Sequence, residues 1–90
     1  MTKPAQLLSG RYEVGPLAGA GGMAQVYRGT DTVLNRVVAI KVLGPQYVQD
    51  AGFVERFRRE AQAAARLNHP NVVSVYDTGS DGPVHYIVME

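Results

Sequence analysis

One stretch of this 90-residue chain has the period of a helix, and strand-like segments stand on both sides of it. Residues 50–67 return an apolar side chain to the same face at successive turns, namely Phe53, Phe57, Ala64 and Leu67. Asp50 is a suitable N-cap, and His69-Pro70 ends the helix because a residue before proline avoids the helical conformation. With a single helix in a chain of this length, the remaining layer of the fold is expected to be a sheet.

The strand-like segments are short and are separated by turn residues. The most regular is residues 36–43, RVVAIKVL, a β-branched run that ends at Gly44-Pro45. Further strands are predicted at 11–19, 24–31, 72–76 and 84–89, with turns at 19–22 and 77–83. This order predicts an α+β fold, a five-stranded antiparallel sheet with one long helix on one side.

Composition limits the class of protein. Hydrophobic residues make up 46% and charged residues 19%, as in an ordinary globular domain, and the net charge of +1 gives no indication of nucleic-acid binding. The absence of cysteine excludes disulfides and thiolate metal sites. We expect a flexible leader over residues 1–10, a single domain over 11–90 and a cytoplasmic location, with any membrane anchor supplied by a segment beyond residue 90.

Two charged residues stand where the pattern calls for apolar ones. Lys41 lies inside the strand 36–43, and Glu60 falls within the apolar face of the helix at about 100° per residue. Since a buried charge without a partner is costly, a pair between Lys41 and Glu60 across the helix–sheet contact would satisfy both. Two alternatives stay open: Glu60 pairs with Arg56 four residues earlier, or Lys41 extends along its strand to solvent.

The glycine-rich segment 19–22 has three interpretations. A Walker loop is excluded because no lysine follows the glycines. A dinucleotide-binding loop matches G-x-G-x-x-G/A, but it requires a helix directly after the loop. A third interpretation places the loop between two strands, ahead of a strand that carries a lysine. In that arrangement glycine backbone amides and the lysine can approach the same phosphate groups.

At this point the sequence resembles the eukaryotic-type protein kinases. The segment 19–26, GAGGMAQV, resembles the kinase loop G-x-G-x-x-G-x-V, with Ala24 in place of the third glycine. Val38-Ala39-Ile40-Lys41 matches V-A-I-K, and Glu60 follows nineteen residues later in a segment similar to the family's αC helix. The Gly-Gly-Met form is similar to bacterial Hanks-type serine/threonine kinases. The resemblance covers residues 11–90 and implies a kinase N-terminal lobe with an αC-type helix.

The resemblance implies ATP as the ligand. Lys41 would hold the α- and β-phosphates and pair with Glu60, Leu17 and Val26 would cover the adenine, and Ala39 would lie beneath it. Met89 would be the gatekeeper, and Glu90 would begin the hinge. The complete implied ATP-binding set is Leu17, Ala18, Gly19, Ala20, Gly21, Gly22, Met23, Ala24, Gln25, Val26, Ala39, Lys41, Met89 and Glu90.

The 90 residues contain neither H-R-D-x-x-x-x-N nor D-F-G. By resemblance these motifs supply the catalytic base and the Mg²⁺ ligands, so we assign no metal ligands to this chain. The family transfers the γ-phosphate of ATP to Ser/Thr hydroxyls of proteins, but we expect this chain alone to be inactive.

The expected partners are ATP, a protein substrate, a C-terminal lobe and a second copy of the chain, because residues 84–89 would form an open edge strand. No nucleic acid is expected. Two other functions stay open, a non-catalytic interaction or dimerisation module on the same fold and the dinucleotide-binding start of an oxidoreductase.

Overall fold

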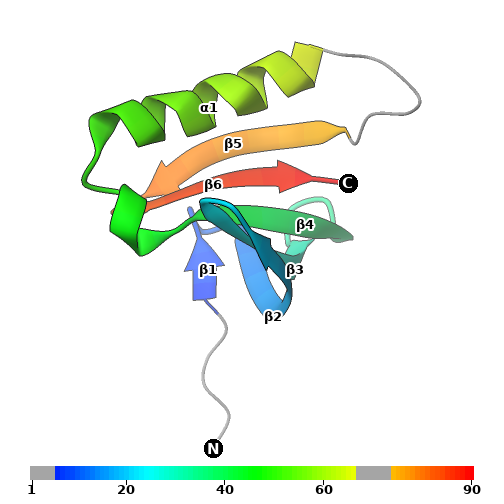
Figure 1. Ribbon diagram of the computed structural model, residues 1–90. Helices are drawn as coiled ribbons and strands as arrows, with labels where there is room; N and C mark the ends of the chain where they lie inside the picture. The colour runs from blue at the N-terminus through cyan, green and yellow to red at the C-terminus, as the bar shows by residue number, and fades with distance from the viewer. Residues whose placement is uncertain (1–5, 67–73) are drawn as a thin grey trace, which may run out of the picture.

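The fold, seen in a computed structural model that describes residues 6–66 and 74–90, is a curled antiparallel sheet with one α-helix on one side (Figure 1). The six strands are ordered β1-β2-β3-β4-β6-β5, and the helix packs on β5 and β6. The elements are β1 (Gln6–Leu8), β2 (Tyr12–Gly21), β3 (Ala24–Asp31), β4 (Arg36–Leu43), the 3-10 helix η1 (Pro45–Tyr47), α1 (Ala51–Arg66), β5 (Val75–Asp81) and β6 (Val84–Met89). The α+β prediction is confirmed, with six strands rather than five.

The additional strand, β1, lies within the predicted flexible leader, and that prediction is wrong for residues 6–10. Leu8 pairs with Tyr12 of β2 and is only 1% exposed. A chain reversal joins the two strands, with Ser9 and Gly10 at positive φ and a hydrogen bond from Arg11 N–H to the Leu8 carbonyl. Three residues are too few to show a strand period, so the sequence pattern did not reveal β1.

The predicted turn at residues 77–83 is also wrong over most of its length, because β5 continues through Asp81. The turn is confined to Gly82-Pro83, where Gly82 has a φ of 58°. Asp77 accepts a hydrogen bond from the Tyr12 hydroxyl, and the Thr78 hydroxyl donates to the Tyr86 carbonyl. These polar side chains, which favour turns in isolation, are therefore satisfied within the sheet.

β6 is an interior strand, which corrects the expectation that residues 84–89 form an open edge. It pairs with β4 on one side and β5 on the other, and Tyr86, Ile87 and Val88 are buried. Their alternation sends side chains to both faces of the sheet, so β6 contributes to two apolar clusters.

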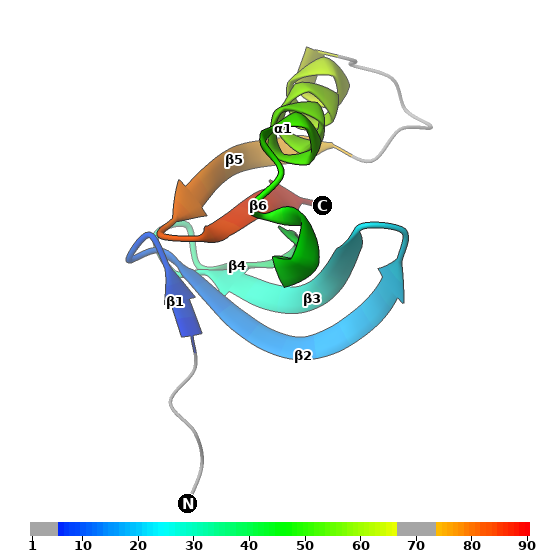
Figure 2. The ribbon, with the colours of Figure 1, turned by 60° about the vertical axis from the view of Figure 1, so that its left-hand side comes forward.

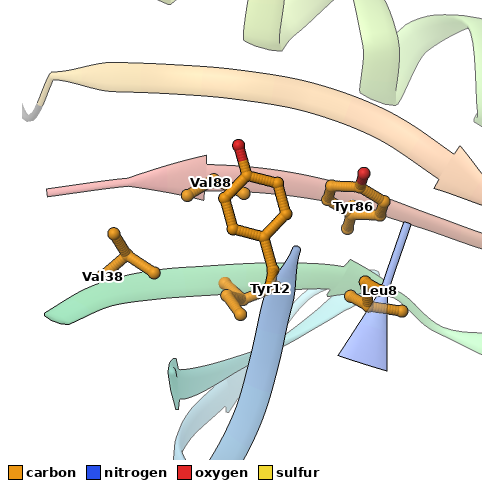
Figure 3. Packing of buried hydrophobic residues seen from close by; sticks show 6 residues of the cluster. Leu8, Tyr12, Val38, Tyr86 and Val88 are labelled. Carbon is orange, nitrogen blue, oxygen red and sulfur yellow. The ribbon is translucent and has the colours of Figure 1, made fainter. Parts of the chain in front are cut away.

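The first cluster fills the concave side of the curled sheet and contains Leu8, Tyr12, Val38, Ile40, Tyr86 and Val88 (Figure 3). The rings of Tyr12 and Tyr86 meet edge to face, with centroids 5.8 Å apart. Figure 2 shows the curl that brings β1 and β2 round toward β6. Hydrogen bonds from Ser9 N–H to Asp81 and between the Ser9 and Tyr86 hydroxyls join the first chain reversal to the β5–β6 hairpin.

The second cluster lies between the opposite face and α1, and contains Ala24, Leu43, Phe57, Ala61 and Ile87. The helix begins after Asp50, whose Oδ1 accepts hydrogen bonds from Gly52 N–H at 2.9 Å and Phe53 N–H at 3.4 Å, as predicted for an N-cap. The start of α1 thus agrees with the predicted helix to one residue, whereas the predicted last residue, Leu67, lies outside the described residues. The predicted helix stop at His69-Pro70, and the strand residues 72 and 73, also lie outside the described residues.

Candidate functional site

The glycine-rich segment forms the turn between β2 and β3, but the turn itself is shorter than predicted. Gly19 to Gly21 are the end of β2, and the turn consists of Gly22-Met23. Gly22 has a φ of 58°, in the left-handed region that favours glycine. The strand β3 follows at Ala24, where a dinucleotide-binding loop requires a helix, so the structure rules out that alternative.

One side of this hairpin end is uncovered. A Cβ atom placed on Gly19, Gly21 or Gly22 would meet nothing within 4 Å, and residues 18–22 are all exposed. The backbone at the tip is therefore accessible to a ligand that approaches closely. This accessibility is the property that phosphate-binding glycine loops share.

Four of the predicted site residues lie on a single face of the sheet. Val26 pairs directly with Lys41, and Ala39 pairs directly with Met89, so the members of each pair point to the same face. Ala39 and Lys41 are two residues apart on β4, which puts both pairs on the same side. An apolar floor, one cation and an open glycine turn at the end of the β2–β3 hairpin can accommodate a flat, anionic ligand.

The remaining predicted residues surround this face less closely. Leu17 pairs with Tyr27 between two register shifts in β2 and is 55% exposed. Ala18, Ala20 and Gln25 are exposed along the β2–β3 hairpin, where the Gln25 side chain accepts a hydrogen bond from the Tyr27 hydroxyl. Glu90 follows β6, and its N–H donates to the Ser74 carbonyl at 2.9 Å.

The predicted pair between Lys41 and Glu60 is not formed. Glu60 pairs instead with Arg56, at 3.3 Å, and its side chain is 58% exposed. Lys41 is half-buried on β4, on the face that α1 covers further along the sheet. The i,i+4 alternative is the one that the structure contains.

Glu60 does not reach Lys41 because of how α1 is rotated about its own axis. The predicted face of Phe53, Phe57, Ala64 and Leu67 omitted Val54 and Ala61, both of which pack toward the sheet. At 3.6 residues per turn, including them moves the centre of the buried face by about 30° away from Glu60. Glu60 is then at the border of the contact between α1 and the sheet, where its carboxylate is exposed to solvent and pairs with Arg56.

Sequence reasoning missed two polar contacts that hold β2 in place. Arg11 donates to both carboxylate oxygens of Asp31, at 2.9 and 2.8 Å, and Asp31 is nearly fully buried. These hydrogen bonds lower the pKa of the Asp31 carboxyl well below its usual range. Burial, aided by the hydrogen bond to Asp77, raises the pKa of the Tyr12 phenol above its usual value. The sequence contained a signal for the Arg11–Asp31 contact, because these opposite charges stand at the outer ends of the predicted strands 11–19 and 24–31.

Sequence reasoning also gave Met23 no role apart from the loop, although its side chain packs against the cluster beneath α1. The sequence indicated this packing by the position of Met23, because an apolar residue stands in a glycine turn where polar residues are usual.

Residues 6–66 and 74–90 show neither a metal site nor a membrane-crossing helix. They contain no group of three or more His, Asp or Glu side chains placed to hold a metal ion. Nor does any helix within those ranges reach the length and apolar character that a membrane crossing requires.

Comparisons with known proteins agree with the sheet, the turn and the lysine strand. The family model of the protein kinase domain matches residues 12–90. The chain is 53% identical over 83 residues to serine/threonine-protein kinase PrkC of Bacillus subtilis (strain 168), covering 92% of this chain and 13% of that protein. It is 54% identical over 94 residues to serine/threonine-protein kinase PknB of Mycobacterium leprae (strain TN), covering 100% of this chain and 15% of that protein.

A solved structure, the kinase domain of PknI of Mycobacterium tuberculosis, superimposes with a TM-score of 0.77 at 32% identity, over 100% of this chain and 36% of that one. The chain thus spans about one seventh of the length of the curated relatives it matches. The match runs through the glycine turn, the lysine strand and α1. The chain belongs to the protein kinase family, in its bacterial serine/threonine branch, and has the architecture of the kinase N-terminal lobe.

Proposed function

We propose that this chain binds ATP as the nucleotide-binding lobe of a serine/threonine protein kinase. The observation that carries the proposal is the common face of Val26, Ala39, Lys41 and Met89 beside the uncovered glycine turn. In the whole protein, the proposed reaction is transfer of the γ-phosphate of ATP to a Ser or Thr hydroxyl of a protein substrate, in the cytoplasm.

Each part of the face has a separate role in this proposal. The turn amides and the Lys41 ammonium bind phosphate oxygens, because both are donors and the oxygens are anionic. Ala39 leaves room for the adenine ring between Val26 and Met89, and Leu17 covers it from β2. Glu90 offers its backbone carbonyl at the end of β6, because its N–H already donates to the Ser74 carbonyl. The described residues present no ligand set for the Mg²⁺ that the family's chemistry implies, so none of them is given a metal role.

Glu60 can join Lys41 only if α1 rotates on the sheet. The rotation would exchange the exposed Arg56–Glu60 pair for one between Glu60 and Lys41. A nucleotide that holds Lys41 in position favours the exchange, because the carboxylate then meets a fixed cation. In that state, Lys41→Met and Glu60→Gln should affect nucleotide affinity non-additively.

ATP affinity of a steric variant tests the proposed adenine site. Ala39→Leu places a larger side chain on the floor of the site and should weaken ATP binding at least about tenfold in titration calorimetry. Ala63→Leu makes the same enlargement at an exposed position of α1, and should leave affinity unchanged. Equal ATP affinity in Ala39→Leu and the unmodified chain would show that the adenine does not bind there.

Lys41→Met tests the phosphate contact. Loss of a charge-assisted contact should weaken ATP binding by about ten- to a hundredfold, whereas adenosine, which has no phosphates, should bind almost equally to both chains. A parallel loss of adenosine binding would contradict the assignment of Lys41 to the phosphates.

Phosphotransfer is the step that we propose these 90 residues do not perform. Their sequence has no H-R-D or D-F-G motif to supply a base or a principal metal ligand. Incubation with labelled ATP, Mg²⁺ and a generic protein substrate should give no transfer above background. Transfer that disappears in Lys41→Met would show that the chain, or an assembly of it, supplies those groups in another way.

A second candidate function, a self-associating module, is favoured by one observation. Val33, Leu34 and Val37 form an apolar patch at the β3–β4 turn and are 66%, 55% and 60% exposed. Large exposed apolar side chains that are adjacent in the chain favour association. This function is compatible with ATP binding, because the patch lies at the opposite end of β3 from the glycine turn.

A further inference from the structure

Met23 is the only residue of the segment 18–23 that is not exposed. Its neighbours Ala20, Gly21 and Gly22 are exposed, and a Cβ on Gly21 or Gly22 would touch nothing. Met23 itself is half-buried and packs against the second apolar cluster. Within residues 18–23, Met23 is therefore the side chain that packs against the rest of the molecule.

The cluster that Met23 contacts joins the sheet to the helix. Its buried members are Ala24 and Leu43 from β3 and β4, Ile87 from β6, and Phe57 and Ala61 from α1. The side chain of the turn and the apolar face of α1 thus belong to one packed unit. A shift of α1 changes the surface against which Met23 rests, because interiors are close-packed.

The backbone of Met23 is tied to the same unit. Its carbonyl accepts a hydrogen bond from Gly44 N–H at 2.7 Å. Gly44 leads into η1, whose Tyr47 packs against the cluster and against the Phe53 ring of α1, at a centroid distance of 5.0 Å. The side chain and the carbonyl of Met23 therefore connect the turn with α1 by two separate routes.

We propose that Met23 is a positioning residue that couples the glycine turn to the docking of α1. The turn holds its place at the end of the β2–β3 hairpin while α1 is packed on the sheet, and each stabilises the other. An unbranched thioether suits this role, since it keeps contact with a surface that moves by a small distance. Where a ligand binds the turn, linkage requires that it also stabilise α1 on the sheet.

Amide hydrogen exchange without any ligand tests the coupling. In Met23→Ala, the amides of α1 should exchange about tenfold faster than in the unmodified chain. The contact of Met23 with the second cluster supplies part of the free energy that keeps α1 packed on the sheet. Met23→Leu should restore exchange nearly to the original rates. Leu7→Ala removes a similar apolar side chain that is 48% exposed on β1, and it serves as the control, with unchanged exchange in α1.

The reverse direction gives a second measurement. Phe57→Leu, a conservative change in α1, should speed exchange of the amides of residues 22–24 relative to those in β1. If exchange in α1 is the same in Met23→Ala as in Leu7→Ala, the coupling does not exist. A uniform increase over all strands in Met23→Ala, with no recovery in Met23→Leu, would equally overturn the proposal.

The ligand-dependent part rests on the proposed ATP binding. ATP added to the unmodified chain should slow exchange in α1 as well as in the turn, and in Met23→Ala it should slow exchange in the turn alone. Slowing of α1 to the same degree in Met23→Ala would contradict the coupling. A chain that binds no ATP in calorimetry refutes the proposed function, whereas the ligand-free exchange rates still decide the role of Met23.

Discussion

The half-buried Arg11 and the buried Asp31 form a two-bond ion pair between the first and last residues of the β2–β3 hairpin region. Asp31 also accepts hydrogen bonds from the N–H groups of Val33 and Leu34, so its carboxylate organises the β3–β4 turn as well. Tyr12, next to Arg11, reaches across the curled sheet to Asp77 of β5. These few side chains fix the position of β2, which carries the glycines.

Asp31→Asn should lower the free energy of unfolding at pH 7, as measured from the urea midpoint. The pKa of Asp31 is lower in the folded chain than its unfolded value of about 3.9, so the ionised carboxylate stabilises the fold. This contribution is complete above about pH 5 and is lost as the pH falls below about 4. The variant should therefore lose less stability than the unmodified chain between pH 5 and pH 2. Equal acid sensitivity in both would show that Asp31 contributes nothing.

Tyr12→Phe removes the hydroxyl that donates to Asp77 and should cost about 1–2 kcal/mol of unfolding free energy near pH 7. Folding raises the pKa of Tyr12, so its contribution is present below about pH 10 and is lost as the pH rises further. The difference between the two chains should shrink above pH 10. Tyr27→Phe, which removes an exposed hydrogen bond to Gln25, is the control and should have a smaller effect at either pH.

Among the elements, α1 is held in place by its N-cap and by one apolar face, and most of its charged side chains lie at the surface. Glu55 pairs with Arg58 and Arg59, and Glu60 with Arg56, all on exposed or half-exposed side chains. Such pairs contribute little to stability. Among the described residues, the hydrogen bonds and ion pairs of the α1 side chains all stay within the helix, so they do not fix its rotation on the sheet, as the Met23 coupling requires.

A double-mutant cycle on the ligand-free chain distinguishes the two partners considered for Glu60. Arg56 and Glu60 should show a coupling of about 0.3–0.5 kcal/mol, as for other exposed i,i+4 pairs. Lys41→Met and Glu60→Gln should be additive in unfolding free energy. A Lys41–Glu60 coupling of several kcal/mol without ligand would mean that α1 docks in solution with Glu60 turned inward.

At the scale of the whole molecule, the sheet closes partly on itself. The contacts of Ser9 with Tyr86 and Asp81, and of Tyr12 with Asp77, join residues more than sixty positions apart. β6 is protected between two strands, so association through that edge is not expected. The exposed apolar surface is concentrated instead at the β3–β4 turn.

The chain should therefore self-associate through Val33, Leu34 and Val37. Replacing Val33 and Val37 by threonine keeps two β-branched residues but makes the surface more polar, and should shift the chain toward monomer in sedimentation equilibrium. Leu7→Thr, at an exposed apolar position on β1, should leave the association unchanged. A monomer at all concentrations in the unmodified chain would refute this association, and an equal shift in Leu7→Thr would show that it is not specific to the patch.

Features that depend only on residues near one another in the chain could be predicted from the sequence. The strands at 24–31, 36–43 and 84–89, the helix with its Asp50 cap, and the left-handed glycine in the turn all follow from local periodicity and backbone preference. The common face of Val26, Ala39, Lys41 and Met89 also follows, once strands of these bounds are paired.

Features that depend on contacts between distant segments could not be predicted from the sequence. β1 and the second half of β5 form because Leu8, Asp77 and Thr78 find contacts across the sheet that their own segments do not reveal. The rotation of α1, and with it the pairing of Glu60 with Arg56, is set by which side chains fill the cluster that Met23 joins. Packing between segments far apart in the chain selects one rotation among several that a helical period permits, and that choice determines which charges meet.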